Sequence, residues 1–187
     1  MRIISGSFKG KKIFEPKNSL TRPLKDLTKE SIFNIIAHSN KLKINLSNAV
    51  VLDLFSGVGS FGIECLSRGV KEVTFIENYK EVLPILKKNL QNLDLNNYKI
   101  IEKDIYNPDT LKKLENKFDI IFLDPPYKDK NLSIIFKNIL NEKILNKNGL
   151  IILHRHKKEK DDFPSNFKII EEKNYGISKI IFLSYCD

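Results

Sequence analysis

Short apolar runs alternate with helix-like patterns along the chain after residue 48. Each run is five to seven residues long and rich in Ile, Val or Phe, as expected for strands that are covered on both faces of a sheet. Alternation of such strands with helices is typical of an α/β fold with a mostly parallel sheet. We therefore predict strands over residues 49–54, 72–77, 98–103, 118–124 and 150–154.

Helical periodicity fills the segments between these runs. Apolar residues recur at spacings of three and four, as at Leu86, Leu90 and Leu93. Two further apolar stretches, 167–175 and 177–185, are separated by one glycine and predict an antiparallel hairpin that closes the sheet. The periodic segments predict helices over 61–68, 79–93, about 108–116 and 131–145.

The first 43 residues follow a different pattern. The runs RIISG and KKIFEP predict a small two-stranded ribbon that turns between Gly6 and Gly10. A helix is expected to begin near Thr21, which can cap its first amides, with Pro23 in the first turn. We interpret residues 1–187 as one domain, with a core over 49–187 and an N-terminal extension over 1–43.

Charge adds information about partners. The chain carries a net charge of +9 at pH 7, which favours a polyanionic partner. Residues 1–43 hold ten Lys or Arg against three acidic residues, so most of the excess lies in the N-terminal extension. A solvated surface in a Lys-rich chain explains the same charges, and composition alone leaves both interpretations open.

Cysteine usage and hydropathy narrow the class of protein. Cys65 and Cys186 lie far apart and give neither a metal-binding spacing nor a disulfide framework. The apolar runs are too short for a signal peptide or a membrane span. We therefore expect a cytoplasmic protein with reduced thiols, without a metal and without membrane binding.

A glycine-rich turn joins the first predicted strand to the next helix. Gly57, Gly59 and Gly62 form a G-x-G-x-x-G pattern, which lets a ligand approach the backbone closely at a helix N-terminus. Glu77, twenty positions after Gly57, ends the second strand and can accept hydrogen bonds from a ribose. A dinucleotide-dependent oxidoreductase fits this pattern. Alternatively, the turn only packs the helix onto the sheet and binds no ligand.

Asp53 changes the expected ligand. An acid directly before the glycine turn would repel a pyrophosphate but suits a ligand with a cationic group. S-adenosylmethionine carries a sulfonium, an amino group and a ribose without any phosphate, so it is the favoured cofactor. Asp104 follows the third strand at the same edge and can accept from the adenine amine or cap the following helix.

The stretch FLDPPY ends the fourth predicted strand at the edge where open α/β sheets bind ligands. An exocyclic base amine is a poor nucleophile, and the Asp124 carboxylate with the Pro125 carbonyl could orient it and stabilise its growing positive charge. Two successive prolines restrict the backbone, and Tyr127 offers a face on which an extruded base can stack. Asp-Pro-Pro alone is also an ordinary strand-ending turn.

Four segments, in this order, resemble the RsmD family: RIISGSFKGKKI, TRPLKDLTKESIFNII, VLDLFSGVGSFGIECLSRG and FDIIFLDPPY. Members are bacterial methyltransferases that use S-adenosylmethionine to modify the exocyclic N2 of one guanine in 16S ribosomal RNA. The resemblance implies an enzyme of the type that modifies guanine 966. The resemblance spans nearly the whole chain, and its least generic parts lie in the N-terminal extension. It implies a Rossmann-like class I methyltransferase with a mostly parallel seven-stranded sheet, an antiparallel last strand and a small N-terminal β-ribbon plus helix.

The same resemblance implies three sets of site residues. Asp124, Pro125, Pro126 and Tyr127 would receive a flipped guanine. The expected partner is 16S ribosomal RNA within a small-subunit particle, bound by a monomer that needs no metal. RNA would be held by Arg2, Lys9, Lys11, Lys12, Arg22, Lys25 and Lys29. The cofactor would be bound by Thr21, Arg22, Pro23, Asp53, Phe55, Ser56, Gly57, Gly59, Glu77, Asn78, Asp104 and Ile105.

Two residues depart from the family pattern. Leu27 stands where a basic residue is usual, which removes a possible phosphate or substrate contact. His154 stands where the fifth strand often ends in an acid, and it begins the stretch HRHKK, for which a solvated turn is preferred over a phosphate-binding role. His38 is assigned a surface or packing role, and Glu64 is assigned local contacts on its helix.

The expected mechanism is direct in-line transfer to nitrogen without a covalent intermediate, with the amine proton lost to water. An N6-adenine nucleic-acid methyltransferase would use the same chemistry, although no segment is spare for a domain that reads duplex sequence. A glutamine methyltransferase would more often show Asn at position 124. A non-catalytic RNA-binding or ribosome assembly factor would need only the basic extension.

Overall fold

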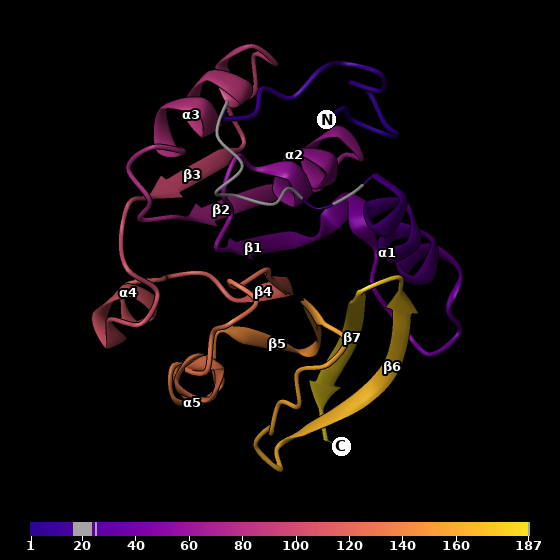
Figure 1. The fold of residues 1–187 in the computed structure, drawn as a ribbon, viewed down its shortest axis with the longest axis vertical. Helices are drawn as coiled ribbons and strands as arrows, with labels where there is room; N and C mark the ends of the chain where they lie inside the picture. Colours follow the sequence, from indigo (N-terminus) through magenta and orange to yellow (C-terminus); the bar gives the residue numbers. More distant parts are fainter. Residues whose placement is uncertain (17–23, 25, 187) are drawn as a thin grey trace.

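A seven-stranded sheet with helices on both faces dominates the computed structural model, which describes residues 1–16, 24 and 26–186 (Figure 1). Four residues predicted to bind the cofactor or RNA, Thr21, Arg22, Pro23 and Lys25, lie outside the described residues. Within the part of the chain that is described, no helix has the length and apolar character needed to cross a membrane.

The strand order is β3-β2-β1-β4-β5-β7-β6. Neighbouring strands from β3 to β5 run parallel, and β7 runs antiparallel to both β5 and β6. This arrangement confirms the predicted mostly parallel sheet with its antiparallel last strand. The strands are β1 Val50–Leu54, β2 Glu72–Ile76, β3 Tyr98–Ile101, β4 Phe118–Leu123, β5 Leu145–His156, β6 Phe167–Tyr175 and β7 Ser178–Tyr185.

Helices α1, α2 and α3 pack on one face of the sheet, and α4 and α5 pack on the other (Figure 1). Strand β4 shows the reason for its uniformly apolar sequence. Ile120 and Phe122 join the core under the first face, while Ile121 and Leu123 join the core under the second. The helices are α1 Asp26–His38, α2 Ser60–Ser67, α3 Leu83–Gln91, α4 Pro108–Lys112 and α5 Leu132–Asn141, with a 3₁₀ turn at Leu46–Asn48.

The segment between α5 and β5 differs from the prediction. Helix α5 ends at Asn141 rather than at residue 145, and β5 already begins at Leu145. Phe118 pairs with Leu145, but Ile120 pairs with Leu150, so a bulge in β5 absorbs the extra residues. Because the bulge residues are polar, a search for apolar runs does not detect that β5 begins at Leu145.

The predicted N-terminal ribbon forms a hairpin over residues 1–13, which packs on the last turn of α2. Arg2 and Lys12 pair as an antiparallel bridge, as predicted for the ribbon. The Ser67 carbonyl accepts a hydrogen bond of 2.8 Å from the Ser7 amide. Gly6 has a φ of +82°, and a Cβ there would lie 1.8 Å from the Ser67 carbonyl oxygen. This contact therefore requires glycine in the SGSFKG turn.

Glu64, in the middle of α2, ties the same hairpin to the helix. Its buried carboxylate accepts hydrogen bonds from the amides of Ile4 at 2.8 Å and Ser5 at 3.0 Å. It also accepts from Arg68 Nε at 2.9 Å, one turn along α2. The Arg68 contact is the local contact expected on the helix, but Glu64 also joins segments about 60 residues apart, which was not predicted.

Lys29 of α1 belongs to the same buried cluster. Its side chain is fully buried, and its Nζ donates a 2.9 Å hydrogen bond to the Arg2 carbonyl. Burial lowers the pKa of Lys29, although the charges of Glu64 and Asp26 oppose this shift. The predicted RNA-binding role of Lys29 was wrong, because the hairpin covers the ammonium group and removes it from the surface.

Candidate active site

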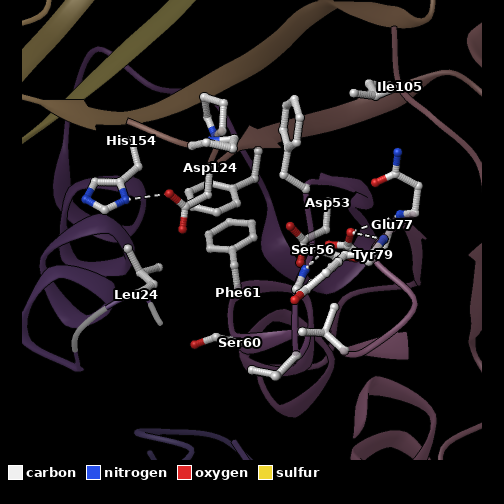
Figure 2. A pocket seen from close by; sticks show the side chains of 18 of the residues that line it. Leu24, Asp53, Ser56, Ser60, Phe61, Glu77, Tyr79, Ile105, Asp124 and His154 are labelled. Atoms are coloured by element: carbon white, nitrogen blue, oxygen red, sulfur yellow. Dashed lines mark hydrogen bonds and ion pairs between the residues drawn. The ribbon is translucent and has the colours of Figure 1, made fainter. Parts of the chain in front are cut away.

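A cavity of about 680 Å³ opens at the carboxyl ends of the central parallel strands (Figure 2). Its volume lies in the range of small-molecule binding sites. Turns that follow four different strands contribute to its wall, so residues far apart in sequence meet there. The predicted site residues that line it are Asp53, Phe55, Ser56, Gly57, Glu77, Asn78, Asp104, Ile105, Asp124, Pro125, Pro126 and Tyr127.

The turn after β1 brings the backbone to the cavity in an unusual conformation. Phe55 has a φ of +58°, which costs energy for a residue with a side chain. Gly57 has a φ of +54°, and a Cβ there would meet no heavy atom closer than the Phe55 carbonyl oxygen at 4.0 Å. Gly57 therefore leaves open space next to its backbone, where a ligand can approach.

Gly59 allows close packing beneath this turn and is not part of the cavity wall. Its φ is +86°, and a Cβ would lie 2.6 Å from Leu86 Cδ1 of α3. Gly62 is similarly confined, since a Cβ would lie 2.3 Å from the Phe75 ring. Two of the three glycines in the motif thus let α2 approach its neighbours, and Gly57 faces the cavity.

Glu77, directly after β2, is fixed by backbone amides. Its Oε2 accepts a 2.7 Å hydrogen bond from Gly57. Its Oε1 accepts from Asn78 at 2.9 Å and from Tyr79 at 2.8 Å. A carboxylate has about four acceptor sites, so these three bonds orient Glu77 and leave capacity for a hydroxyl donor in the cavity.

Asp53 lies at the bottom of the cavity and is 1% exposed. Its Oδ2 accepts a 2.9 Å hydrogen bond from the Gly62 amide at the start of α2. Burial raises the pKa of Asp53 well above its usual range, and the charges of Asp124 and Glu77 add to the shift. An acidic group in this position favours a ligand that brings positive charge into the cavity.

We expect Asp53→Asn to raise the melting temperature by a few degrees at neutral pH. A folded-state pKa above the unfolded value means that the wild type is favoured at low pH and loses stability as the pH rises through the folded pKa. Asparagine can still accept from Gly62 but carries no charge. Thermal denaturation across pH should show the difference shrinking toward about pH 4. An equal difference at every pH would contradict this account.

Asp124 lies directly after β4 and contacts the end of β5. Its Oδ1 is 2.8 Å from Nδ1 of His154, which is 6% exposed and also lines the cavity (Figure 2). The Tyr127 hydroxyl lies 3.0 Å from Ser178 Oγ, and its ring meets the His154 ring edge-on at 6.0 Å. The preferred interpretation of HRHKK as a solvated turn was therefore wrong for His154.

Arg155, the next residue, is 2% exposed and holds the loop that follows β4. Its guanidinium donates to both Asp161 oxygens, at 2.9–3.1 Å. It also donates to the carbonyl of Pro126 at 3.3 Å and to that of Asp129 at 2.9 Å. Arg155 was thus also misread as solvated, and β5 supports the Asp-Pro-Pro-Tyr turn through two consecutive side chains.

Tyr106 and Asp129 complete the wall on the side of β3 and were missed by the sequence analysis. The Tyr106 hydroxyl donates to Asp129, and burial together with this bond raises the pKa of Tyr106. The Tyr106 ring lies 5.9 Å from that of Phe55. Asp104 accepts a 3.0 Å hydrogen bond from the Tyr106 amide, while the side chain that caps α4 is that of Asn107.

The remaining predicted RNA-binding residues that the structure describes lie on the hairpin surface. Arg2 has a side chain that is 74% exposed, although its Nε lies 3.8 Å from Asp26. Lys9, Lys11 and Lys12 are exposed as well. Leu27, the departure from the basic residue of the family pattern, is 69% exposed near this surface on α1.

Comparison with known proteins decides the family. The family model described as Conserved hypothetical protein 95 matches residues 1–184. Ribosomal RNA small subunit methyltransferase D of Haemophilus influenzae is 34% identical over 179 residues, covering 95% of this chain and 90% of that protein. The chain belongs to the RsmD family. It is therefore a methyltransferase of the RsmD family, as the resemblance of its motifs predicted.

Solved structures agree on the fold. An Escherichia coli protein, provisionally named methyltransferase yhhF, matches with a TM-score of 0.83 and 27% identity over 99% of this chain and 97% of that one. SMU.776, a more distant protein that was solved in complex with SAH, matches with a TM-score of 0.62 and 16% identity. That match covers 84% of this chain and 49% of SMU.776, and it shows the shared fold alone. The fold is the predicted Rossmann-like class I methyltransferase fold.

Proposed function

We propose that this RsmD-family protein transfers a methyl group from S-adenosylmethionine to the exocyclic N2 of one guanine in 16S ribosomal RNA, of the position-966 type. One observation carries the proposal. The Asp124 carboxylate and the Gly57–Glu77 pair face the same cavity, so an acceptor for a base amine lies beside a cradle for a nucleoside-like donor. The name of the Haemophilus influenzae relative supports ribosomal RNA as the substrate.

The cavity residues fit S-adenosylmethionine. When bound, the cofactor would supply an electrophilic methyl group on its sulfonium. Glu77, held by three amides, would accept hydrogen bonds from the ribose hydroxyls, and Gly57 would let the donor lie against the backbone. Asp53 would face the cationic end of the cofactor, while Asp104 and Ile105 would border its adenine. The methyltransferase name of the Haemophilus influenzae relative supports a methyl donor in this cavity.

Asp124 would act on the substrate as an acceptor and orienter. Its carboxylate would accept a hydrogen bond from the N2 amine, hold the lone pair toward the methyl group and stabilise the positive charge that develops on nitrogen. The surplus proton would leave to water after the new bond forms. Cys65 is buried outside the cavity wall, and burial raises the pKa of its thiol, which argues against a cysteine nucleophile.

The exposed hairpin cations would bind RNA phosphates. We expect the triple variant Lys9→Ala, Lys11→Ala and Lys12→Ala to weaken RNA binding about 10-fold or more, and to lower the slope of log K against log salt by up to about 3. A matched control replaces Lys112, Lys113 and Lys117, which are also exposed, at the end of α4 and beyond it. Equal losses in both triples would show that only net charge matters.

Product identification tests the function directly. The protein is incubated with methyl-labelled S-adenosylmethionine and either unmodified 16S ribosomal RNA, small subunits lacking the modification, or DNA. Mass spectrometry of the nucleosides should show N2-methylguanosine from an RNA sample. N6-methyladenosine would instead support the adenine methyltransferase alternative. Absence of transfer with tight RNA binding would favour a non-catalytic assembly factor, and a titration with the cofactor would separate that case.

A further inference from the structure

His154 contacts Asp124 in a way that the mechanism above does not use. The bond from Nδ1 to Oδ1 is 2.8 Å long and joins residues 30 positions apart (Figure 2). The imidazole is more than nine-tenths buried, and among the described residues its Nε2 has no hydrogen-bond partner. The buried polar ring is therefore held on the described chain through its contact with the carboxylate that faces the cavity.

Chemistry restricts what this contact can do. An ionised carboxylate only accepts hydrogen bonds, so the proton between the two groups belongs to Nδ1. The contact occupies Oδ1, restricts rotation of the carboxylate and leaves Oδ2 to accept from a substrate. This arrangement orients Asp124.

The support behind His154 is rigid. His154 lies in β5, where it pairs with Ile180 of β7. The preceding residue, Leu153, pairs with Leu123, the last residue of β4. His154 thus projects from a paired strand, and Asp124 is the first residue after one, where its amide still donates a 3.4 Å hydrogen bond to the Leu54 carbonyl of β1. Groups supported in this way can hold an active-site side chain to the tolerance that methyl transfer requires.

We propose that His154 is a positioning residue for methyl transfer, which holds Asp124 so that Oδ2 faces the target amine. This inference rests on the proposed function, in which Asp124 accepts from that amine. His154 stands where the family pattern often has an acid, so the inference assigns a role to a residue that departs from this pattern.

Three substitutions separate the effect of the Nδ1 hydrogen bond from the effect of side-chain volume. His154→Asn keeps an N–H donor near the position of Nδ1, His154→Gln moves it toward the position of Nε2, and His154→Leu removes it. We expect kcat to fall about 10- to 100-fold for Leu and for Gln, but no more than about 3-fold for Asn. KM for S-adenosylmethionine and the melting temperature should stay near the wild-type values in all three.

A double-mutant cycle tests whether His154 acts through Asp124. In an Asp124→Ala background, which has no acceptor for Nδ1 and whose residual rate is followed with labelled donor, His154→Leu should change kcat by less than about 2-fold. The inference is overturned if His154→Leu keeps the wild-type kcat, or if His154→Asn lowers kcat as much as His154→Leu does. It is also overturned if the effects of the His154 and Asp124 substitutions on kcat multiply in the double variant. A wild type that methylates no nucleic acid would instead overturn the proposed function, and this inference with it.

Discussion

Asp124→Ala is expected to abolish nearly all methyl transfer, with a fall in kcat of about 10²–10³-fold or more, while the affinity for S-adenosylmethionine changes little. The carboxylate lies directly after β4 at the cavity and, in the proposed mechanism, accepts from the amine where positive charge develops. Loss of one such preorganised group costs about 2.7–4 kcal/mol in comparable sites. Single-turnover transfer of labelled methyl and a calorimetric titration with the cofactor measure the two quantities separately.

The control for this variant is Asp109→Ala, which removes an exposed carboxylate in the first turn of α4. It should keep the wild-type kcat. Activity retained by Asp124→Ala would place the reacting amine elsewhere in the molecule. Loss of cofactor affinity together with activity would instead assign Asp124 to the donor rather than to the acceptor.

Arg155→Met is expected to lower the free energy of unfolding by about 3–5 kcal/mol. The guanidinium is 2% exposed, and its partner Asp161 has a side chain that is 8% exposed, so methionine leaves a buried carboxylate without its cation. The carbonyls of Pro126 and Asp129 lose a donor at the same time. Urea denaturation at neutral pH measures the effect.

Two further variants give this prediction its controls. Arg2→Met removes an exposed arginine and should change stability by no more than about 0.5 kcal/mol. Arg155→Met combined with Asp161→Leu removes both charges and should recover much of the loss, since no buried ion is left unpaired. A single Arg155→Met variant as stable as the wild type would show that the loop after β4 does not depend on this contact.

The sheet was predictable because its central strands are covered on both faces. Ile120 to Leu123 alternate between two cores and therefore read as one apolar run, which marks both β4 and the position of Asp124 at its end. The early start of β5 was not predictable in the same way, because the polar residues of its bulge interrupt the apolar pattern.

Single charged residues whose burial depends on distant segments escaped the sequence analysis. His154 and Arg155 stand in a basic stretch, and only the pairing of β5 with β7 and the loop after β4 enclose them. Lys29 lies on a helix within a basic segment, and only the hairpin that folds over it shows that it is not a phosphate ligand. Local patterns carry no information about such coverings, which depend on tertiary contacts.

Helix α2 connects the N-terminal hairpin to the cavity. Eight residues long, or about 12 Å, it starts at the glycine turn and ends beneath the hairpin, to which Glu64 and Ser67 bond it. One continuous set of hydrogen bonds therefore connects the exposed hairpin to the helix whose first residues line the cavity. In the proposed function, the segment that would hold RNA and the turn that would hold the cofactor are thus fixed to opposite ends of one helix.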